Sequence, residues 1–216
     1  MFEEVFPNLF AFYATDYSAN SYLLVGKKTV LIDTGLKSRG PALKDSLAAV
    51  GFEPEDIDAL LLTHGHSDHF GASYIFPNAE KYMHKFDATY VNIKDVIFTA
   101  AARLNNLYFP RITKNYEIDS IIDVAPFKLK VLSTPGHTLG SVCLYDEKNK
   151  LLFSGDTIFN GSVGRHDLPS GSKMDLIDSL KKLKELDFDY LFPGHGLMLK
   201  EGQEENIKMG IEMLSQ

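Results

Sequence analysis

The chain has 216 residues, a length that fits one domain and leaves little room for a second. Its 29 acidic residues outnumber 22 basic ones, and the net charge of −7 disfavours nucleic acid as a partner, because cationic side chains bind phosphate backbones. The single cysteine, Cys143, excludes an intramolecular disulfide and fits a reducing compartment. The acidic start and the absence of a ~20-residue apolar run predict a soluble, cytoplasmic protein with no membrane partner.

Apolar strands and amphipathic helices alternate along the chain, which favours a layered α/β fold. Two short strands over 22–25 and 29–32 flank a tight turn, and a helix follows from Pro41 to a stop at Gly51. Five further strands are predicted, at 59–63, 128–134, 141–145, 151–154 and 190–192.

Between these strands, apolar residues recur every three or four positions over 85–106, as on one face of a helix. The sequence therefore predicts a helical insertion at about 85–116 within a single domain covering 1–216. Two interpretations stay open, an outer-layer helix that packs on the core and a lid that lines a substrate pocket. A later helix is capped by Ser170 or Ser172, and a last amphipathic helix covers 201–214.

Three of the seven histidines lie in one stretch, 63–71, directly after a buried strand. Ligand sites in α/β folds form at the carboxyl ends of strands. Seven side chains share that placement: His64, His66, Asp68, His69, His137, Asp156 and His195. Five imidazoles and two carboxylates exceed what one four-coordinate ion uses, and they suit two cations such as zinc, iron or manganese. His84 has no ligand-like companions and is expected to be a bystander.

The motifs His-x-His-x-Asp-His, Pro-Gly-His, Gly-Asp-Thr and Pro-Gly-His-Gly resemble, in this order, those of the metallo-β-lactamase superfamily over about residues 20–196. The resemblance implies an αββα sandwich of two mixed β-sheets with metals at one edge. Asp33 would orient a ligand from outside the coordination shell. The implied ligand sets are His64, His66 and His137 for one metal, Asp68, His69 and His195 for the other, and Asp156 as the bridge.

The loop Gly164-Arg165-His166-Asp167 resembles the Gly-Arg-x-Asp loop of the glyoxalase II-like (hydroxyacylglutathione hydrolase-like) branch, with His166 in place of the usual threonine. Arg165 and His166 are accordingly the expected substrate-binding residues, and a salt bridge that only holds the loop is the alternative for Arg165. The residues after His195 include few cations, so the basic extension by which glutathione thioesterases grip glutathione is expected to be missing.

The predicted function is that of a dinuclear metal-dependent hydrolase, in which a metal-bound hydroxide attacks an ester, thioester or lactone carbonyl and Asp68 moves the proton. Two zinc ions are expected, with iron or manganese as alternatives, and the partner is a small acyl substrate. The acyl group and any homo-oligomer stay open. One competing hypothesis is a mononuclear iron persulfide dioxygenase that uses His64, His137 and Asp156. The other is a metal-stabilised binding scaffold without catalysis.

Overall fold

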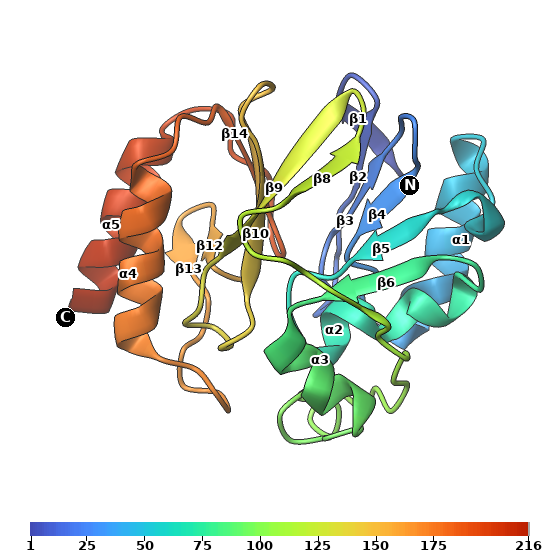
Figure 1. The fold of residues 1–216 in the computed structure, drawn as a ribbon, viewed down its shortest axis with the longest axis horizontal. Helices are drawn as coiled ribbons and strands as arrows, with labels where there is room; N and C mark the ends of the chain where they lie inside the picture. Colours follow the sequence, from blue (N-terminus) through green and yellow to red (C-terminus); the bar gives the residue numbers. More distant parts are fainter. Residues whose placement is uncertain (216) are drawn as a thin grey trace.

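The computed structural model describes residues 1–215, which form two β-sheets packed face to face with helices on both outer sides (Figure 1). Helices α4 (Lys173–Lys184) and α5 (Gln203–Ser215) cover one sheet, and α1 (Gly40–Ala49), α2 (Ser67–Phe70) and α3 (Lys85–Asn92) lie on the side of the other (Figure 1). The predicted αββα sandwich is therefore the observed architecture. No described helix combines the length and apolar character that crossing a bilayer requires.

The first sheet has seven strands in the order β1-β2-β3-β4-β5-β6-β7. Its strands are antiparallel from β1 to β4 and parallel from β4 to β7, so the sheet is mixed. The strand bounds are β1 Glu3–Phe6, β2 Leu9–Phe12, β3 Ser21–Leu24, β4 Val30–Ile32, β5 Ala59–Leu61, β6 Glu80–Met83 and β7 Lys114–Asn115.

The second sheet has the order β14-β11-β10-β9-β8, in which only the β11–β14 pair is parallel. A separate two-stranded hairpin, β12–β13, follows β11. The bounds are β8 Ile121–Val124, β9 Phe127–Ser133, β10 Val142–Asp146, β11 Leu151–Gly155, β12 Ile158–Phe159, β13 Ser162–Val163 and β14 Tyr190–Pro193.

The described residues also form five α-helices and three short 3₁₀ helices. The α-helices are α1 Gly40–Ala49, α2 Ser67–Phe70, α3 Lys85–Asn92, α4 Lys173–Lys184 and α5 Gln203–Ser215. The 3₁₀ helices are η1 Lys37–Arg39, η2 Pro54–Asp56 and η3 Gly71–Ile75. The Ser172 hydroxyl caps α4 by accepting a hydrogen bond from the Asp175 N–H.

The layered packing explains why the predicted strands are apolar on both faces. Successive side chains of a strand point to opposite faces of the sheet. In β3, Leu24 joins the core between the two sheets, and its neighbour Leu23 joins the core beneath the helices of the first sheet. A third core lies between the second sheet and α4 and α5, where Leu180 and Ile207 are buried. The inner strands β3, β4, β10 and β11 are therefore buried on both faces.

The helix predicted over 85–106 is wrong in its extent, because α3 ends at Asn92. Lys94 and Ala100 have left-handed backbone angles, φ 60° and 54°, which a continuing α-helix excludes. The Asp95 carboxylate accepts the Ile97 and Phe98 N–H groups and so replaces helical hydrogen bonds. The segment from Ile93 to the start of β7 consists of turns and irregular structure.

Candidate metal centre

All seven predicted ligands converge at one end of the sandwich, where strands from both sheets finish. His64 and His66 follow β5, and α2 carries Asp68 and His69. The second sheet contributes the other three ligands, each just after a strand: His137 after β9, Asp156 after β11 and His195 after β14. The carboxyl ends of these strands thus bring together residues up to 131 positions apart, from 64 to 195.

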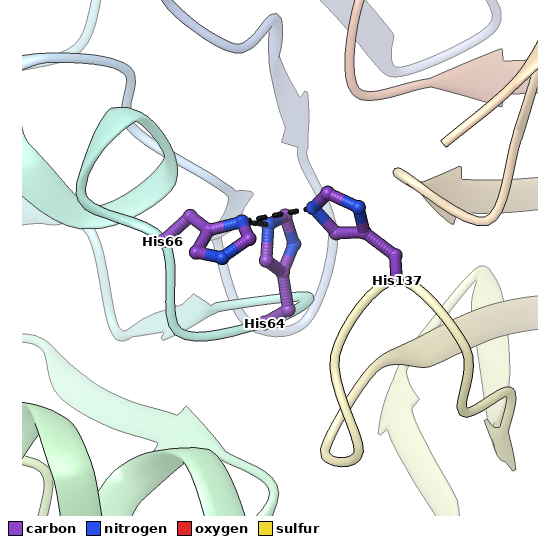
Figure 2. A group of neighbouring side chains, drawn as sticks. All are labelled: His64, His66 and His137. Atoms are coloured by element: carbon purple, nitrogen blue, oxygen red, sulfur yellow. Dashed lines mark hydrogen bonds between the residues drawn. The ribbon is translucent and has the colours of Figure 1, made fainter. Parts of the chain in front are cut away.

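Three imidazoles form the first ligand set. His66 Nδ1 lies 3.1 Å from His64 Nε2 and 2.8 Å from His137 Nε2, and Figure 2 shows the three ring nitrogens meeting at one point. All three side chains are buried. Ligand atoms about 2.0–2.1 Å from a tetrahedral zinc ion lie about 3.3 Å from one another. The set is therefore close to the spacing that a single cation requires.

The second set combines a carboxylate with two imidazoles. His195 Nε2 lies 3.3 Å from Asp68 Oδ2, and His69 Nε2 lies 4.0 Å from the same oxygen. These three side chains meet the distance condition for a shared metal ion. Asp68 and His195 of this set line the same cavity as His66 and His137 of the first.

Asp156 lies between the two sets. Its Oδ1 is 3.3 Å from His69 Nε2, and its Oδ2 is 3.5 Å from His137 Nε2 and 3.6 Å from His195 Nε2. A third potential metal-binding group, of His64, His69 and Asp156, connects the first set with the second. One carboxylate thus reaches imidazoles of both sets.

Unsatisfied polar atoms show that these residues fit bound cations. His69 Nε2 and Asp156 Oδ1 are buried and have no hydrogen-bond partner within residues 1–215. A buried polar atom without a partner costs about 1–3 kcal/mol, so native proteins retain few of them. A divalent cation would satisfy both atoms at once.

Burial keeps the imidazoles of the first set in the neutral form that metals bind. It lowers the pKa of His64 well below its usual value, lowers that of His66 to about 3, and also lowers that of His137. Burial acts in the same direction on His69, but the Asp156 and Asp33 carboxylates outweigh it and raise the pKa of that imidazole.

Asp33 contacts the predicted ligand His69 and is not among the residues that line the cavity. His69 Nδ1 donates to Asp33 Oδ2 at 2.8 Å, which leaves His69 Nε2 to face Asp156. The same carboxylate accepts the Thr63 N–H at 2.9 Å and the Thr63 hydroxyl at 2.8 Å. His137 is held in a similar way, since its Nδ1 donates to the Arg165 carbonyl at 2.6 Å. Such outer contacts fix the tautomer and the ring orientation of a ligand.

Asp87, a buried carboxylate of α3, also supports the ligands, and the sequence analysis missed it. Its Oδ2 accepts the Gly65 N–H and the Thr138 hydroxyl, each at 2.7 Å, and its Oδ1 accepts the Gly140 N–H at 2.9 Å. Asp87 therefore ties the loop of His64 and His66 to the loop of His137. The contact leaves no room for a side chain at position 140, because a Cβ on Gly140 would lie 2.2 Å from Asp87 Oδ1, but this contact appears only in the folded chain.

A cavity of about 680 Å³ opens onto the ligands. Arg165 lines it, but the Arg165 guanidinium binds the Asp167 carboxylate through two contacts, of 2.9 and 2.8 Å. His166 is not among the lining residues, and its Nδ1 is buried without a partner within residues 1–215. His84 accepts the Phe86 N–H at the start of α3 and joins no metal-binding group of the described chain.

Comparisons with known proteins agree with this geometry. A family model of the metallo-beta-lactamase superfamily matches residues 14–195. A probable metallo-hydrolase of Methanocaldococcus jannaschii is 35% identical over 191 residues, which cover 83% of this chain and 88% of that protein. The hydroxyacylglutathione hydrolase GloC of Haemophilus influenzae is 32% identical over 165 residues, covering 69% of this chain and 74% of that protein.

A similar solved structure, a crystal structure in a di-iron-bound form, has a TM-score of 0.73 and 31% sequence identity, and the match covers 94% of this chain and 96% of that one. The sequence and the fold of this chain are thus similar to those of known proteins. The chain belongs to the metallo-β-lactamase superfamily.

Proposed function

We propose that this metal-dependent hydrolase cleaves an ester, thioester or lactone of a small acyl substrate at a dinuclear centre, as in the glyoxalase II-like branch. The observation that carries the proposal is the position of Asp156, whose two oxygens face imidazoles of both ligand sets at 3.3–3.6 Å. The relatives that are named as a metallo-hydrolase and a hydroxyacylglutathione hydrolase support hydrolysis. The di-iron form of a similar structure supports two metal positions.

Two divalent cations bound by these residues would supply hydroxide near neutral pH and polarise the carbonyl of the substrate. The chain itself provides the alignment. Asp33 fixes the His69 ring, the Arg165 carbonyl fixes the His137 ring, and Asp156 spans the two sets. Rigid alignment of this kind is the protein's main contribution at a hydrolytic metal site.

Asp68 is the proposed proton carrier. Its carboxylate lines the cavity and its side chain is 13% exposed, so a substrate can reach it. Burial acts to raise the pKa of Asp68, but the hydrogen bond from His195 and the charge of His69 lower it. The carboxylate is therefore ionised at neutral pH and could accept a proton at the oxygen that a metal leaves free, and deliver it to the leaving group.

A substrate panel with separately reconstituted zinc, iron and manganese protein tests this function. We expect hydrolysis of small activated esters, thioesters or lactones, without consumption of oxygen. A glutathione thioester should show a high Michaelis constant, because the chain has few cations after His195 to grip the peptide. Oxygen consumption with a persulfide and no hydrolysis would favour the dioxygenase. Metal binding without turnover of any substrate would favour the scaffold.

A further inference from the structure

Among residues 1–215, the cavity above the predicted metal ligands is lined by one cation without a charged partner. Arg103 lines this cavity together with four charged residues that are already engaged: Asp16, Asp68, Asp156 and Arg165. Asp16 pairs with Arg39 at 3.5 Å, Arg165 pairs with Asp167, and the other two carboxylates face imidazoles. The Arg103 guanidinium makes no hydrogen bond or ion pair with any residue from 1 to 215, and we therefore ask what it binds.

The segment that carries Arg103 is fixed to the ligand loop itself. The Ser67 N–H donates to the Thr99 carbonyl at 2.9 Å, and the Asn106 amide donates to the Ser67 carbonyl. Ser67 stands between the ligands His66 and Asp68 in the sequence. Both ends of the 99–106 segment are therefore attached to the residue between two predicted ligands, so the fold holds the backbone that carries Arg103 beside them.

Buried side chains and a backbone hydrogen bond also hold the 99–106 segment in place. Thr99 and Ala101 are fully buried, and the Asn106 N–H donates to the Ala101 carbonyl at 3.0 Å. An apolar cavity of about 220 Å³ shares Arg103 with the metal-facing one, and its lining includes Val96 and Phe98. Arg103 is exposed and stands at the boundary of the two cavities, where its guanidinium is open to a substrate.

We infer that Arg103 binds a carboxylate of the substrate, apart from the carbonyl that is cleaved, and so selects anionic acyl substrates. A guanidinium offers planar, paired donors that match a carboxylate. Arg165, the residue that the loop motif suggested for this task, already has such a partner in Asp167. The inference rests on the proposed hydrolase function and names its substrate class.

The test uses two thioesters with the same neutral thiol, one a glutaric acid monothioester and the other its methyl half-ester, which lacks the charge. Metal-loaded wild type should have the higher kcat/KM on the carboxylate-bearing thioester. Arg103→Gln should lower that kcat/KM on the order of 10- to 100-fold, mainly through KM, and should change the neutral reaction by less than about threefold. Arg103→Lys should retain part of the selectivity, because it keeps the charge but loses the planar donor pair.

Arg111→Gln is the matched control. Arg111 lies in the same irregular segment, is exposed, and lines a different cavity, so its substitution should leave both rates unchanged. Wild type without a preference for the anion, or an equal loss on both thioesters in Arg103→Gln, would overturn the inference and leave the hydrolase intact. Failure of wild type to hydrolyse these thioesters and every ester and lactone of the substrate panel would contradict the proposed function, and the inference would fail with it.

Discussion

Asp156 is the residue on which the two ligand sets depend. Its carboxylate reaches His69 through one oxygen and His137 and His195 through the other. Asp156→Ala should therefore bind neither metal. Its activity should fall at least about 100-fold, because a ligand shared by both sets is removed. His84→Ala is the control, since His84 only caps α3. Equal metal loss in the two variants, by elemental analysis, would show that the site is assigned wrongly.

Asp87 should affect metal binding without touching a metal. Burial raises the pKa of Asp87 to about 6, against three hydrogen bonds that act to lower it. In Asp87→Asn, an amide NH₂ would face a backbone N–H, either that of Gly65 or that of Gly140. We expect metal affinity to fall about 10- to 100-fold, as for other outer contacts of ligands. The exposed Asp45→Asn should leave metal affinity unchanged, and unaltered affinity in both variants would refute the role.

His66 should make the metal-free protein sensitive to acid. Burial lowers its pKa to about 3, whereas the unfolded chain takes up that proton near 6.5. Between these values the unfolded state binds one more proton, so the free energy of unfolding falls as the pH falls, by about 1.4 kcal/mol per pH unit. Urea unfolding of metal-free wild type and His66→Gln between pH 6.5 and 5 should show a shallower slope in the variant. Identical slopes would contradict this.

At the scale of elements, the turn before His137 packs directly on α4. Gly136 has φ 138°, and a Cβ there would lie 2.4 Å from the backbone of Leu176. The Ser172 N–H also donates to the Gly136 carbonyl at 2.8 Å. Gly136 thus lets the His137 turn and the first turn of the helix touch.

Gly136→Ala should therefore cost more stability than a glycine substitution that meets only backbone strain. Gly51 provides that comparison, because its φ is 88° and nothing lies within 4 Å of an added Cβ. We expect Gly51→Ala to lower the free energy of unfolding by about 1–2 kcal/mol and Gly136→Ala by more, with weaker metal binding as well. Chemical denaturation of both variants measures this, and equal losses would contradict the packing argument.

The irregular segment after α3 shows where sequence periodicity failed. Ile93 and Ile97 fitted a helical face, yet their exposed fractions are 66% and 67%. The helix ends because Asp95 bonds to nearby N–H groups and Lys94 has a left-handed backbone, and neither effect appears in a pattern of apolar residues. If this segment acts as a lid, the lid is a turn-rich loop and not a helix, and it carries Arg103 to the cavity.

At the scale of the whole molecule, the sequence predicted the parts of the site that stand in short motifs. The predicted ligands follow apolar strands that the pattern identifies, and the family resemblance supplies the αββα sandwich of two mixed sheets. Asp87 and Arg103 could not be predicted, because each acts through contacts with segments distant in sequence, Asp87 through Gly140 and Arg103 through the cavity. Local patterns say little about such contacts.

Both sheets contribute residues to each ligand set, so both sets form only in the folded molecule. The number of metal ions that the folded molecule binds is therefore the most direct test of a dinuclear centre. Elemental analysis of protein reconstituted with excess zinc or manganese and then desalted counts them directly. Two complete ligand sets joined by Asp156 predict close to two metal ions per chain. One tightly bound iron with the second set still empty after reconstitution would contradict the dinuclear account and favour the mononuclear dioxygenase.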